Sequence, residues 1–123
     1  FSADLSTTFN VSFAHMPLWD NRLDKKWNSS SRKFPLLSNR GPKDGNENSP
    51  SITLDDDGTW RGWVYYSDHS IDWVEGTTIV SRWQRNDGVQ QDCIFKEESD
   101  SSDDAMLGFT LDMDDYGPTY SWD

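Results

Sequence analysis

The sequence contains two histidines, His15 and His69, and the neighbours of His69 could take part in catalysis. His69 stands in the run Ser67-Asp68-His69-Ser70, and an Asp–His pair beside a serine is the set of groups that activates a nucleophile in hydrolases. Neighbours along the chain do not by themselves have triad geometry, and the sequence has no Gly-x-Ser-x-Gly elbow. The run is more typical of a polar turn. We therefore assign no catalytic residue, and a small hydrolase remains an alternative.

Acidic residues gather in turns that could offer oxygen ligands to a hard cation such as Ca²⁺. The run Asp55-Asp56-Asp57-Gly58 fails the EF-hand pattern, because its first and twelfth positions would be Thr53 and Val64. Two further groups are equally typical of solvated turns: Asp68 with His69 and Asp72, and Asp112 with Asp114 and Asp115. We assign no metal ligand and expect no cofactor.

Aromatic side chains are the strongest chemical signal in the sequence. Six of them fall within 24 residues: Trp60, Trp63, Tyr65, Tyr66, Trp73 and Trp83. In a strand over 59–66, the two-residue alternation puts Trp60 and Tyr66 on one face, and Arg61, Trp63 and Tyr65 on the other. Both faces would then be aromatic. Either the strand is buried on both sides, or one face is a binding platform.

Indole and phenol rings stack on sugar rings and on planar hydrophobic ligands, while their polar tips form hydrogen bonds. This chemistry predicts a binding site for a carbohydrate or another neutral small ligand. The residues that we assign to ligand binding are Arg61, Trp63, Tyr65, Trp73, Arg82 and Gln84. Coplanar exposed rings at Trp63 and Trp73 would favour a sugar. Rings that line a closed cavity would favour a barrel, and rings covered by another chain would favour an assembly.

Net charge excludes some classes of partner. The chain has 11 basic and 22 acidic residues, a net charge of −11, which argues against nucleic acid as the main partner. Residues 1–50 carry seven basic and five acidic residues, or +2, and residues 51–123 carry four and seventeen, or −13. The basic segment 20–50 therefore either pairs with the acidic remainder of the chain or docks a protein partner. No apolar run is long enough to span a membrane, so we expect no membrane insertion.

Cysteine content and sequons bear on the compartment. Cys93 is the only cysteine, so an internal disulfide is excluded. Two sequons begin at Asn10 and Asn28, and the chain starts at Phe1, so we expect any signal segment to have been removed. The sequons favour a secreted protein or one in an organelle lumen, whereas the unpaired cysteine slightly disfavours the extracellular interpretation.

Alternating patterns and tight turns indicate an all-β fold. Strands are predicted over 51–54, 59–66, 77–85, 89–96 and 106–113, with turns at Asp57-Gly58 and Asp87-Gly88. Three-residue loops with a left-handed glycine would pair these residues: Leu54 with Trp60, Ile52 with Gly62, Ile79 with Phe95, Val80 with Ile94, and Arg82 with Asp92. One short helix is plausible over 18–27, followed by a polar connection at about 28–50.

We therefore predict a single domain over 1–123: an all-β antiparallel meander that forms a sandwich or small barrel with at most one short helix. In outline this resembles a calycin-type barrel or a small β-sandwich. The leading hypothesis is a non-enzymatic carbohydrate-binding domain. The alternatives are an accessory or structural subunit of a larger assembly, a calycin-like barrel that carries a hydrophobic or pigment-like ligand, and a small hydrolase.

Overall fold

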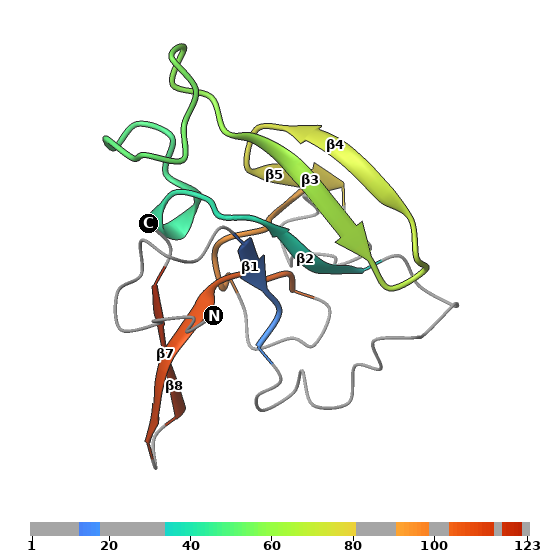
Figure 1. The fold of residues 1–123 in the computed structure, drawn as a ribbon, viewed down its shortest axis with the longest axis vertical. Helices are drawn as coiled ribbons and strands as arrows, with labels where there is room; N and C mark the ends of the chain where they lie inside the picture. The colour runs from blue at the N-terminus through green and yellow to red at the C-terminus, as the bar shows by residue number, and fades with distance from the viewer. Residues whose placement is uncertain (1–12, 18–33, 81–90, 99–103, 115–116, 122–123) are drawn as a thin grey trace, which may run out of the picture.

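The computed structural model of the chain describes residues 13–17, 34–80, 91–98, 104–114 and 117–121. Its largest unit is an antiparallel sheet of four strands in sequential order: β1 (Phe13–His15), β2 (Pro35–Asn39), β3 (Arg61–Tyr66) and β4 (Ile71–Glu75) (Figure 1). Two further antiparallel pairs follow: β5 (Thr78–Val80) with β6 (Gln91–Cys93), and β7 (Phe109–Asp114) with β8 (Gly117–Ser121). The predicted all-β antiparallel meander is confirmed, and the described strands form no closed barrel.

Helix is nearly absent from the described residues. They contain one 3₁₀ turn, η3 (Lys43–Gly45), and no helix long and apolar enough to cross a bilayer. The predicted helix over 18–27 lies outside the described residues. The segment expected as a polar connection contains both β2 and η3, because Leu36 and Ser38 alternate into the buried face of the sheet.

The core lies against one face of the four-stranded sheet. Trp60 and Phe95 are its largest fully buried side chains, and their rings meet edge to face with centroids 4.9 Å apart. The other fully or nearly buried apolar residues are Ala14, Met16, Phe34, Leu36, Val64, Tyr66, Ile94, Ala105, Met106 and Leu107. Because Trp60 and Phe95 come from different hairpins, this ring pair joins the sheet to the segment after β6.

The segment after β2 is held to this core by Trp60. The Trp60 indole donates a hydrogen bond to the Arg40 carbonyl at 2.6 Å, and its backbone N–H donates to a Glu47 carboxylate oxygen at 2.7 Å. Gly41 lies directly under the Phe95 ring, where a Cβ atom would come within 2.1 Å of a ring carbon. Both donor groups of Trp60 are therefore satisfied, which a buried indole and amide require.

Of the two pairings predicted for the first hairpin, one is confirmed. Leu54 pairs with Trp60, and Gly58 is left-handed at φ +78°, with its N–H donating to the Asp55 carbonyl at 2.8 Å. The pairing of Ile52 with Gly62 is wrong. Gly62 pairs with Val74 of β4, since β4 follows β3 through the turn at 67–70 and takes that edge.

The predicted register of the second hairpin is wrong by three residues. Ile79 pairs with Asp92 and Val80 with Gln91, instead of with Phe95 and Ile94. Ile94 and Phe95 leave the strand in a turn and are fully buried. Burying two large apolar side chains is worth roughly 3–6 kcal/mol, against at most about 1 kcal/mol for the expected cross-strand pair of Arg82 and Asp92. Arg82 and the Asp87-Gly88 turn lie outside the described residues.

Other predicted strands are shorter or displaced. Of the strand predicted over 51–54, the structure has a single bridge, from Leu54 to Trp60. In place of the strand predicted over 106–113 it has β7, preceded by a bridge between Gly108 and His15. β4 and β8 were not among the predicted strands. β4 was missed because the turn before it contains no glycine. β8 was missed because it contains Pro118 and follows acidic residues that are typical of a turn.

Candidate functional site

The candidate site is the outer face of the four-stranded sheet, opposite the core. Strand pairing aligns two rows of side chains across all four strands on this face. One row holds Phe13, Asn39, Trp63 and Trp73, and the other holds His15, Leu37, Tyr65 and Ile71. We call the apolar members of these rows the aromatic face: Phe13, Leu37, Trp63, Tyr65, Ile71 and Trp73. The alternation predicted for 59–66 is confirmed, because Trp60 is buried and Trp63 is exposed.

Trp63 and Trp73 form the centre of the aromatic face. They are directly opposite residues of β3 and β4, and their rings meet edge to face, with centroids 5.1 Å apart and planes at 69°. The relative exposures of the two residues are 55% and 50%. Such T-shaped contacts are a favoured geometry for aromatic pairs. The two rings are exposed but not coplanar, so they lack the coplanar arrangement that would favour a sugar, and they form a corner with two ring surfaces at a steep angle.

Two further apolar side chains extend the exposed surface. Phe13 on β1 has a relative exposure of 54%, and Ile71 on β4 has 59%. Large apolar groups aligned on one face of a sheet mark an interaction surface more often than single scattered ones. The sequence analysis did not assign Phe13, Ile71 or Asn39 to the site. The alternation of Ile71, Trp73 and Glu75 was the signal that could have found the β4 members.

Arg61 borders the aromatic face and is held by carboxylates. Its guanidinium forms a two-pronged ion pair with Asp57, at 2.7 and 3.1 Å, and contacts Asp55 at 2.8 Å and Glu75 at 3.7 Å. The hydrogen bond from Arg61, helped by the Thr59 backbone N–H, lowers the pKa of Asp57 to about 2. Arg61 therefore ties the 55–58 turn to the sheet. It offers a ligand a fixed charge that is already largely compensated.

At the other end of β3, Tyr65 meets the turn that leads into β4. The Tyr65 hydroxyl and His69 Nδ1 share a hydrogen bond of 2.6 Å. The Ser70 hydroxyl donates to Asp68 at 2.6 Å, and His69 is left-handed at φ +67°. These bonds link Tyr to His and Ser to Asp, which is not the Ser–His–Asp order of a catalytic triad. The interpretation of this run as a polar turn is confirmed.

The structure brings together four of the six predicted ligand-binding residues: Arg61, Trp63, Tyr65 and Trp73 all lie on the outer face of β3 and β4. Arg82 and Gln84 lie outside the described residues. Groups able to hold a metal ion meet elsewhere, at Asp92, Glu98 and Asp104, which the sequence analysis did not assign. No local pattern in the sequence marks these three residues as neighbours, because they meet through the packing of 92–95 against 104–107.

Comparison with known proteins gives no identity to this site. No protein-family model, curated protein or solved structure matches the chain. The function is therefore argued from the residues themselves.

Proposed function

We propose that the chain is a non-enzymatic binding domain that holds a carbohydrate, or a similar neutral ligand, on the aromatic face. The main support for this proposal is the Trp63–Trp73 pair. Both rings are fixed by direct strand pairing and by edge-to-face contact, yet each residue remains about half exposed. A tryptophan that contributes little to the core but is held in one orientation is suited to stacking on a ligand.

The corner between the two rings suggests how a sugar would bind. One indole would stack on the apolar C–H surface of a pyranose ring, and the second would form a wall beside it. Polar groups also lie on this side of the sheet: the Asn39 amide and the Tyr65 hydroxyl within the two rows, and the Glu75 carboxylate opposite Arg61. Asn39 Oδ1 accepts a hydrogen bond from the Trp63 backbone N–H at 2.8 Å, which helps to fix the Asn39 side chain before a ligand arrives. Such preorganisation lowers the entropic cost of binding.

A protein partner is the second candidate, in line with an accessory subunit of a larger assembly. The exposed Ile71 and Phe13 favour it, because an aliphatic side chain and a peripheral ring bury well against another protein. The two candidates share the same face but differ in which residues matter. Sugar binding depends on the two indoles, whereas a protein interface would also depend on Ile71.

A glycan array with the full chain, followed by calorimetry on any retained glycan, tests the proposal. Trp63→Ala and Trp73→Ala should each weaken binding by about 30-fold, or about 2 kcal/mol, as expected for an aromatic anchor. Val80→Ala is the matched control, because Val80 is exposed on β5 and lies off the aromatic face. Retention that survives both tryptophan substitutions would contradict the proposal. Self-association that Ile71→Asp abolishes, with no glycan retained, would favour the protein partner.

A further inference from the structure

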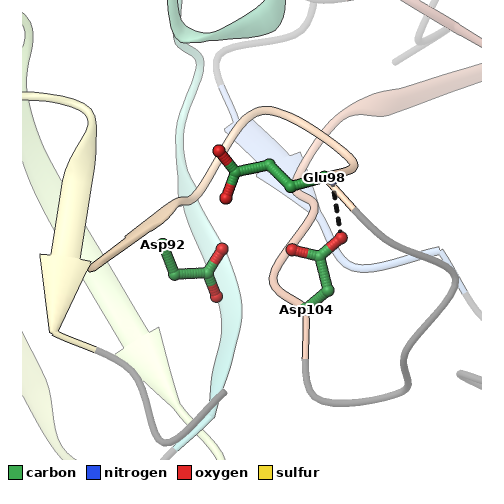
Figure 2. A group of neighbouring side chains, drawn as sticks. All are labelled: Asp92, Glu98 and Asp104. Carbon is green, nitrogen blue, oxygen red and sulfur yellow. Dashed lines mark hydrogen bonds between the residues drawn. The ribbon is translucent and has the colours of Figure 1, made fainter. Parts of the chain in front are cut away.

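A second group of side chains lies apart from the aromatic face. Asp92 on β6, Glu98 in the segment after it, and Asp104 bring their carboxylates together, as Figure 2 shows. One oxygen from each residue lies within 4.8 Å of the other two. We call these three residues the acidic cluster. It lies beside the core, because Ile94, Phe95 and Ala105 are its chain neighbours and all three are fully buried.

Backbone hydrogen bonds hold two of the three carboxylates in place. The Ala105 N–H donates to Asp92 Oδ2 at 2.9 Å, and the Glu98 N–H donates to Asp104 Oδ2 at 2.8 Å (Figure 2). The segments that carry them are also joined by the Leu107 N–H, which donates to the Ile94 carbonyl at 2.7 Å. The contacts between 92–95 and 104–107 therefore place Asp92 and Asp104 side by side, and backbone hydrogen bonds orient both carboxylates.

The buried oxygen of Asp92 is the feature that points to a ligand. The residue is fully buried, its side chain points toward Asp104, and its Oδ1 atom has no hydrogen-bond partner among the described residues (Figure 2). A buried carboxylate oxygen without a donor costs free energy that a native structure normally recovers from a cation or another donor. Asp104 is also fully buried, so two carboxyl groups share this interior position.

The close approach of the three carboxylates also has an electrostatic cost. Three carboxylates at such short range repel one another when ionised. A divalent cation that accepts all three as ligands at once removes this repulsion.

We propose that Asp92, Glu98 and Asp104 form a Ca²⁺ site. All three ligands are carboxylate oxygens, which hard cations prefer, and the cluster offers no nitrogen or sulfur. Ca²⁺ binds oxygen at about 2.3–2.6 Å, so two ligands on opposite sides of the ion lie about 4.6–5.2 Å apart. The ligand oxygens of the acidic cluster all lie within 4.8 Å of one another, which does not exceed the span of a Ca²⁺ ion between two ligands. Mg²⁺ demands near-ideal octahedral geometry at about 2.0–2.1 Å and gives up its water ligands reluctantly, so a group of three protein carboxylates suits it less than it suits Ca²⁺.

An ion would enter the acidic cluster from the side of Glu98. Glu98 is only partly buried, whereas Asp92 and Asp104 are fully buried. Bidentate carboxylates and water on the Glu98 side would complete the six to eight oxygens that Ca²⁺ takes. The site would act structurally, because it ties β6 to the segment that leads into β7. It is independent of the function proposed for the aromatic face.

Thermal unfolding and calorimetry of the full chain, with Ca²⁺ or with EDTA, test this proposal. Ca²⁺ should raise the unfolding temperature of the wild-type chain, and Mg²⁺ at equal concentration should raise it less. Asp92→Asn keeps the size of the side chain and an acceptor for the Ala105 N–H, but removes one charge. It should weaken Ca²⁺ binding at least about tenfold. It should also unfold at a higher temperature than the wild type in EDTA and at a lower one in Ca²⁺.

The matched control is Asp56→Asn, which removes one charge from the exposed 55–58 turn. It should leave the Ca²⁺ response unchanged. If Asp92→Asn does not fold, Glu98→Gln replaces it, because Glu98 is only partly buried and should tolerate the change. The proposal is overturned if Ca²⁺ does not stabilise the wild-type chain, or if the variants of the cluster respond to Ca²⁺ as strongly as Asp56→Asn does.

Discussion

Trp60 and Trp63 lie three positions apart in the chain and on opposite faces of the four-stranded sheet. Trp60 is fully buried against Phe95, and its indole donates to the Arg40 carbonyl at 2.6 Å. Trp63 is largely exposed and meets Trp73 edge to face. Trp60 is therefore part of the core and Trp63 part of the exposed face, and substitution of each residue can test the two roles separately.

Trp60→Ala should destabilise the fold by about 3–5 kcal/mol, because it removes the largest core side chain and leaves a cavity beside Phe95. Trp63→Ala should leave the denaturant midpoint nearly unchanged and remove ligand retention. Chemical denaturation of both variants, read by circular dichroism, checks this contrast. Collapse of both variants would mean that the aromatic face also belongs to the core.

Gly41→Ala should cost about 1–3 kcal/mol, since its Cβ atom would lie 2.1 Å from the Phe95 ring and force that ring to move. In a Phe95→Leu background the cost should fall, because the smaller side chain leaves room. A double-mutant cycle in urea measures this coupling. Additive effects of the two substitutions would show that Phe95 does not pack on Gly41.

Substitution of Gly58 measures the free-energy cost of placing a side chain at a left-handed backbone position. Its φ is +78°, and no heavy atom lies within 4 Å of the position of a Cβ. Gly58→Val should therefore lose about 1–2 kcal/mol through backbone strain alone, and Gly58→Asn clearly less, since Asn tolerates this region. Equal losses in the two variants, measured as denaturant midpoints, would contradict a left-handed Gly58.

Tyr66 should titrate late at alkaline pH. Burial raises its pKa to about 12, and the charges of Asp72 and Asp68 act in the same direction. The raised folded-state pKa means that Tyr66 contributes stability below about pH 10, which is lost as pH rises toward 12. Absorbance at alkaline pH should show one tyrosine ionising about two pH units after an ordinary tyrosine, and Tyr66→Phe should remove that late step.

Added salt should stabilise the chain at neutral pH. Its net charge of −11 makes the compact state repel itself, and ions screen that repulsion. The midpoint of urea unfolding should rise from low salt to about 0.5 M sodium chloride, where the Debye length is below about 10 Å. A midpoint that does not change with salt would contradict this expectation.

Local patterns in the sequence were enough to predict the faces of β3 and the turn at Gly58. Alternation along a strand follows from backbone geometry, so Trp60 and Trp63 had to point to opposite sides once 59–66 was a strand. The Asp-Asp-Asp-Gly turn is equally local, because only its glycine readily accepts a positive φ. The all-β class follows from the same short-range signals.

Only the tertiary structure decided the register of β5 and β6, the angle between Trp63 and Trp73, and the acidic cluster. Register depends on which side chains reach the core, and the burial of Ile94 and Phe95 moved the pairing by three residues. The cluster forms because that shift turns Asp92 inward, where the segment 104–107 brings Asp104 beside it. Such long-range packing leaves no periodic trace in the sequence, since each residue meets partners that lie far along the chain.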